Sequence, residues 1–114
     1  MNSVMLLGNL ATDVDVKVVA GDRKVAKFLL AVGRIGSKRE KKPADFFRIV
    51  AWSKQAENAG RYLRKGSRVC VTGRLQGEFY EKPDGSETRL NTEVMADQIE
   101  YLSPPVTAAG GRKK

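Results

Sequence analysis

Three of the eight aromatic residues of this chain lie within seven positions, residues 46–52, where the sequence reads FFRIVAW. Successive side chains of a strand point to opposite faces, so Phe46, Arg48 and Trp52 would share one face, together with Val50. A guanidinium is costly to bury without a partner, and we therefore expect this face to be partly in water. Flat rings can stack on planar groups, and a cation beside them attracts anions. The opposite face is apolar and is expected to form core: Phe47, Ile49 and Ala51.

The residues before this stretch predict two further strands and a loop. The first strand opens at residues 5–7, is interrupted at 8–9 and continues over 15–19, where charged and apolar residues alternate. The second strand covers residues 25–32 (VAKFLLAV) and is mostly apolar. Residues 34–42 (RIGSKREKK) carry five basic residues and one acid, which is typical of an exposed loop.

A short helix is predicted directly after Trp52. Its small apolar face is spaced at i, i+3, i+4 and i+7, which is the helical period. Ser53 has the side chain of an N-cap residue and stands at the expected start. The residues of the apolar face are Ala56, Ala59, Gly60 and Leu63.

Two strands joined by a long hairpin complete the expected fold. They cover residues 69–75 and 92–102, and the hairpin spans 77–90, with turn-forming residues at 82–85 (KPDG). This order of elements predicts an all-β protein with one short helix, a five-stranded OB-fold barrel with a long hairpin before the last strand. Closing such a chain into a barrel removes exposed strand edges.

The chain is expected to hold one domain, residues 1–103, followed by a disordered tail. The tail, residues 104–114, begins with two prolines and is small, glycine-rich and basic. A chain of 114 residues leaves little room for a second core.

The charge of the chain is unevenly distributed around a net value of +8. Residues 1–77 hold 16 basic and 6 acidic residues, whereas residues 78–100 hold 2 basic and 7 acidic residues. A basic body with a locally acidic segment favours a polyanionic partner, although many small basic proteins bind no nucleic acid.

The composition disfavours several classes of protein. Cys70 is the sole cysteine and no histidine is present, so no disulfide framework, histidine-based relay or histidine metal site is expected. Asp13 and Asp15 could share a face but are a weak catalytic signal, and no phosphate-binding glycine loop occurs. No apolar run approaches the length needed to span a bilayer, and no leader is evident. We expect a soluble, cytoplasmic protein that is not an enzyme and needs no cofactor or metal.

Taken together, several short stretches of the chain resemble the bacterial single-stranded DNA-binding protein family (SSB). The resemblance runs in order over about residues 1–102, and it is specific in combination rather than in any single piece. It implies an OB barrel that assembles as a homotetramer and binds single-stranded DNA during replication, recombination and repair. The stretches that carry it are VMLLGNL at 4–10, FFRIVAW at 46–52 with Lys54, YLRKGS at 62–67, VTGRL at 71–75 and TEV at 92–94.

The resemblance also implies which side chains stack on bases. Phe46 matches a position that is usually tryptophan, Trp52 one that is usually phenylalanine, and Tyr80 a tryptophan position in the hairpin. A fourth position falls near Arg34, where this chain has no aromatic residue but where a guanidinium could stack. Phe79 would extend the track beside Tyr80.

Phosphate neutralisation is expected from cations along the same path. A sequence-tolerant binder of single strands needs cations for the backbone beside rings for the bases. Phe46 and Trp52 would be about 20 Å apart on an extended strand, with room for several nucleotides and with a cation between them. The expected phosphate-binding residues are Arg34, Arg48, Lys54, Lys17, Lys38 and Arg39.

Three points stay open from the residues alone. Full-length family members end in an acidic tip that recruits replication proteins, whereas this chain ends in Arg112, Lys113 and Lys114. The sequence is then either a shortened form or a short paralogue, and recruitment through such a tip is not expected. An OB-fold adaptor acting through protein contacts and an RNA-binding OB module remain alternatives, because stacking does not read the sugar.

Overall fold

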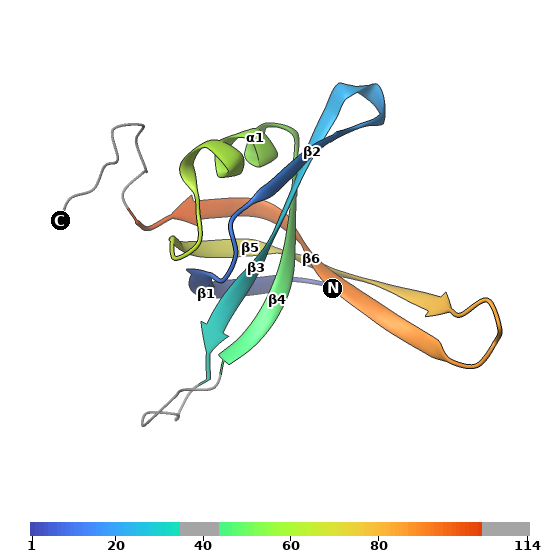
Figure 1. The fold of residues 1–114 in the computed structure, drawn as a ribbon. Helices are drawn as coiled ribbons and strands as arrows, with labels where there is room; N and C mark the ends of the chain where they lie inside the picture. Colours follow the sequence, from blue (N-terminus) through green and yellow to red (C-terminus); the bar gives the residue numbers. More distant parts are fainter. Residues whose placement is uncertain (35–43, 104–114) are drawn as a thin grey trace.

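The computed structural model describes residues 1–34 and 44–103, which form six strands and one α-helix (Figure 1). Lys38, Arg39 and the tail 104–114 lie outside the described residues. Over these residues no helix has the length and apolarity needed to span a membrane. The elements are β1 (Val4–Leu10), β2 (Asp15–Val19), a 3-10 turn (Ala20–Asp22), β3 (Arg23–Gly33), β4 (Ala44–Trp52), α1 (Ser53–Tyr62), β5 (Arg68–Glu81) and β6 (Thr88–Tyr101).

The strands close into a ring. Their order in the sheet is β1-β5-β6-β4-β3-β2, and a further pairing of β1 with β3 joins the two sides. The expected five-stranded OB barrel is thereby confirmed, with β1 and β2 as two parts of the first strand. All neighbours are antiparallel except β4 and β6, which pair in parallel at Ile49–Val94 and Val50–Met95.

The expected continuation of the first strand is confirmed, although its interruption is placed differently. β1 and β2 follow one another along the same side of β3, at Leu30–Ala31 and then at Arg23–Lys27. The break falls at residues 11–14, because Gly8 and Asn9 still pair with β5. Glycine is required at position 8, where a Cβ would collide with the backbone oxygen of Ala31.

The core lies inside the ring and beneath α1. Phe47 packs against this core, while Ile49 and Ala51 are fully buried, as the alternation in β4 predicts. The helix contributes Ala56 and Ala59, whose small side chains let it lie close to the barrel. The largest fully buried side chains belong to five residues: Leu30, Ile49, Val69, Val71 and Val94.

The predicted N-cap at Ser53 is wrong. The cap position is Trp52, no side chain there bonds to the helix, and Ser53 already lies within α1. Ser53 adopts a φ of 55°, in the left-handed region that non-glycine residues rarely occupy. The helix therefore starts from a strained junction directly after the tryptophan.

The long hairpin is an extension of β5 and β6 beyond the ring (Figure 1). Its turn is closed by a 2.8 Å bond from the Gly85 N–H to the carbonyl of Lys82. The Asp84 carboxylate accepts a further bond of 2.9 Å from the Ser86 N–H, and this bond lowers the pKa of that carboxyl. The predicted turn chemistry is confirmed, and the hairpin is continuous with the barrel strands.

Candidate nucleic-acid interface

The outer face of β4 is continuous with one face of the hairpin. Paired residues on neighbouring strands lie on the same side of a sheet, and Val50 pairs with Met95 of β6. Counting by two from Met95 along β6 leads to Arg89, which pairs with Tyr80 of β5. Tyr80 therefore lies on the face that carries Phe46, Arg48 and Trp52, although about thirty residues separate it from them in the chain. We call this surface the outer face.

Exposure along β4 follows the predicted alternation with one exception. Phe46 is 59% exposed and Arg48 is exposed, whereas Trp52 is half-buried. Val50 was expected on a partly wet face but is only 2% exposed. Its neighbours are Lys27 and Met95 of the adjoining strands, and their side chains stand on either side of it. The outer face thus has a closed centre with aromatic residues toward its two ends.

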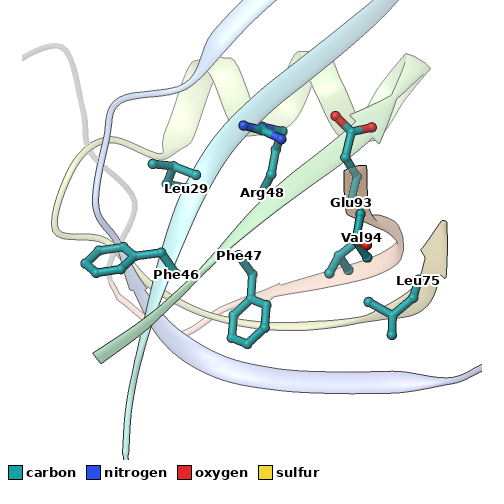
Figure 2. A pocket seen from close by; sticks show the side chains of 8 residues that line it. Leu29, Phe46, Phe47, Arg48, Leu75, Glu93 and Val94 are labelled. Carbon is teal, nitrogen blue, oxygen red and sulfur yellow. The ribbon is translucent and has the colours of Figure 1, made fainter. Parts of the chain in front are cut away.

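A hollow of about 400 Å³ opens where β4 and β6 diverge (Figure 2). Phe46 and Arg48 border it from β4, and Glu93 and Leu75 border it from the hairpin. Figure 2 shows that Arg48 and Glu93 extend to the same side of the sheet, whereas Phe47 points the opposite way. The hollow is therefore largely apolar with one charge of each sign at its rim, which suits a planar ring that carries polar edges.

The two aromatic residues of the hairpin occupy opposite faces. Tyr80, on the outer face, is 49% exposed. Phe79 is 79% exposed and pairs with Leu90, itself 60% exposed, on the face that continues the barrel interior. Sequence reasoning placed both residues on one track, but adjacent residues of a strand cannot share a face.

The predicted phosphate-binding cations fall into two groups. Among the described residues, Arg48 and Lys54 make no ion pair. Lys17 lies 3.7 Å from Asp15, so its charge is partly compensated. Arg34 donates through Nε and Nη2 to Asp45 at 3.0 and 2.8 Å, and this bond raises the pKa of the guanidinium.

Sequence reasoning missed Arg23. The Cζ of its guanidinium lies 5.1 Å from the ring centroid of Trp52, within cation–π range. Arg23 stands two residues before Val25, which pairs with Trp52, so the contact is diagonal across β3 and β4. The alternation of β3 would have placed Arg23 and Val25 on one face, but the register against β4 was needed to find the ring.

The described residues offer no metal site, since no three histidine, cysteine, aspartate or glutamate side chains gather there. Cys70 is half-buried in β5, beside Leu7 of β1.

Comparison with known proteins agrees with this geometry. Residues 1–102 match the Single-strand binding protein family. The chain belongs to this family. It is 43% identical over 105 residues to the single-stranded DNA-binding protein of Bacillus cereus, and 43% identical over 103 residues to that of Clostridium tetani. These alignments cover 91% and 90% of the chain, but 61% and 70% of the relatives, so the chain spans less than two thirds of the Bacillus protein.

A solved structure of the Plasmodium falciparum SSB in complex with ssDNA has a similar fold. Its TM-score is 0.78 at 29% identity, and the alignment covers 90% of this chain and 96% of that chain. The family membership predicted from the short motifs is therefore confirmed, as is the fold that the resemblance implies.

Proposed function

We propose that the chain is a non-catalytic, sequence-tolerant binder of single-stranded DNA that acts in replication, recombination and repair. The observation that carries this proposal is the outer face itself. Two exposed rings and one half-buried ring, Phe46, Tyr80 and Trp52, share it with Arg48, a cation that has no described acidic partner. Lys54 also has no described acidic partner and follows Trp52 by two residues, in the first turn of α1. The names of the relatives and the bound ssDNA of the Plasmodium structure support the same function.

Stacking and counterion release supply the binding free energy in this proposal. Each base stacked on a ring contributes about 1–3 kcal/mol, and any base can stack because every base has a π-face. Arg48 lies between Phe46 and Trp52 on β4, where the phosphates of a strand stacked on both rings would pass. Lys17 and Arg34 would contribute less to phosphate binding, because each would first have to break its ion pair with an aspartate. Phe79 would stack only on a strand that crosses the opposite face of the hairpin.

We propose further that residues 1–103 act as the binding domain and assemble as a homotetramer in the bacterial cytoplasm. Within the described residues, the side of β1 facing away from β5 is paired only at Asn9 and Leu10. The outward side chains Met5 and Leu7 are 70% and 47% exposed. A free edge beside exposed apolar side chains favours pairing with another copy. Light scattering in moderate salt tests this, and a monomer would contradict it.

The experiment for the main proposal uses the single tryptophan. The chain is titrated with oligo(dT), with the matching ribo-oligomer and with duplex DNA, and Trp52 emission is followed at several salt concentrations. We expect quenching by single-stranded DNA, with an affinity that falls as salt rises. Equal binding to duplex would overturn the proposal and favour the adaptor. Tighter binding to the ribo-oligomer would favour the RNA module.

A further inference from the structure

The contact between Arg23 and Trp52 covers one face of a ring that the proposed function requires for stacking. Arg23 is exposed and makes no ion pair with a described residue. Its guanidinium is 5.1 Å from the ring centroid. A base inserted between the two would need a separation of roughly 7 Å, twice the contact distance of carbon atoms. A base can use this ring face only if the guanidinium leaves it.

The surroundings give the guanidinium room to leave. Arg23 lines a hollow of about 310 Å³ together with Asp22, Lys24, Ser53 and Glu57. Lys24 donates to Glu57 at 3.2 Å, and this bond is the main reason why the pKa of that carboxyl is lowered. Lys24 thus already neutralises one of the two acids. Asp22 is the remaining carboxylate that could compete for the guanidinium.

The backbone is strained on both sides of the contact. Among the described residues, two that are not glycine have a positive φ, Asp22 at 59° and Ser53 at 55°. One directly precedes Arg23 and the other directly follows Trp52. Aspartate tolerates this conformation better than serine does. Such outliers cluster at binding sites, where neighbouring structure maintains them.

We propose that Arg23 is a positioning residue for DNA binding, which holds the Trp52 ring in the free protein and moves to a backbone phosphate when a base stacks. An exposed cation–π contact is weaker than base stacking, so the exchange favours the bound state. The charge is not lost, because a strand stacked on Trp52 carries its phosphates past the same hollow. This inference rests on the proposed function and adds one phosphate contact to it.

The test compares Arg23→Ala and Arg23→Lys with the wild-type chain in oligo(dT) titrations. For Arg23→Ala we expect weaker binding, a salt slope smaller by about 0.7 for one lost phosphate contact, and a changed Trp52 emission spectrum without DNA. Lysine should restore the slope. Arg74→Ala is the matched control, because Arg74 pairs with Met95 on the outer face but already lies 3.6 Å from Asp97. Its slope should stay at the wild-type value.

The outcomes separate this inference from the proposed function. If the wild-type chain binds oligo(dT) and Arg23→Ala binds equally or more tightly with an unchanged slope, Arg23 merely covers the ring or moves to Asp22, and the inference is overturned. If the wild-type chain does not bind single strands, the proposed function fails and this inference fails with it. Thermal unfolding of each variant checks that the fold is retained, as the exposure of Arg23 leads us to expect.

Discussion

The barrel part of the outer face and the hairpin both present aromatic rings, but they differ in their cations. On and beside the barrel, Arg23, Arg48 and Lys54 have no described acid within ion-pair distance, whereas Lys27 and Arg74 lie 3.9 and 3.6 Å from Glu93 and Asp97. On the hairpin, each cation lies within ion-pair distance of an acidic side chain. The pairs are Lys82 with Glu87 at 4.0 Å and Arg89 with Glu87 at 2.6 Å.

We expect this difference to give the two regions separate tasks in the proposed DNA binding. Residues 77–90 hold two basic and four acidic residues, a net charge of −2, so the hairpin cannot attract a phosphate backbone by its field. It can still stack. We therefore expect the barrel part to supply both stacking and counterion release, and the hairpin to supply stacking alone. Affinity measured against salt concentration distinguishes these contributions.

The largest effect is expected from removing both rings of β4. The double variant Phe46→Ala with Trp52→Ala should lose about 2–6 kcal/mol of binding free energy, because two stacking positions contribute about 1–3 kcal/mol each. Anisotropy of a labelled oligo(dT) measures this without tryptophan. Phe46 is largely exposed, but Trp52 is half-buried, so the unfolding midpoint must be measured in parallel. Affinity within threefold of wild type would mean that DNA does not follow this face.

Tyr80→Ala sharpens the comparison from the hairpin side. We expect a loss of about 1–3 kcal/mol with an unchanged salt slope, because a ring is lost and no phosphate contact is. Phe79→Ala is the matched control, since Phe79 is the adjacent ring on the opposite face. A larger loss from Phe79 than from Tyr80 would show that the strand crosses the inner side of the hairpin.

Arg48→Ala tests the cations of the barrel. The salt slope should fall by about 0.7, since one phosphate contact on a single strand is lost. Arg89→Ala removes a cation of the hairpin that Glu87 already compensates, and it should leave the slope unchanged. The comparison between the two regions would be wrong if both variants changed the slope equally.

Ser53→Gly addresses a smaller difference, in backbone conformation. The hairpin turn places a glycine, Gly85, at its positive φ of 73°, whereas the junction after Trp52 places a serine at 55°. Relieving this strain should stabilise the fold by about 0.5–1 kcal/mol in urea unfolding, because glycine adopts the left-handed region at little steric cost. Ser53→Ala keeps its Cβ and should show no such gain. A destabilised glycine variant would mean that the side chain of Ser53 matters more than its φ.

The features that could be predicted from the sequence depend on residues that are close together in the chain. The period of two in FFRIVAW places Phe46, Arg48 and Trp52 together whatever the rest of the fold does, and the structure confirms that arrangement. The hairpin turn follows equally from its own four residues. Lys17 and Asp15 are two apart on one strand, so their pairing was also available from the sequence.

What the sequence could not predict depends on register between strands. Val50 is buried because Met95 arrives beside it from β6, some 45 residues later in the chain. Arg34 bonds to Asp45, eleven positions later in the chain, where β3 ends and β4 begins. The contact of Arg23 with Trp52 likewise needs the β3–β4 pairing to be known. The properties of single residues do not reveal which residues of neighbouring strands will lie beside each other.

The alternation of side chains between the two faces of the hairpin limits how its length can change. No side chain between positions 74 and 92 is fully buried, so removing residues there leaves the barrel core intact. Side chains alternate between faces, however, and a deletion of one residue from a strand would exchange the positions of Tyr80 and Phe79. Shortening by two residues from each strand would keep both assignments. The hairpin can therefore change its reach in steps of two residues per strand, during evolution or by design, while each ring stays on its own side.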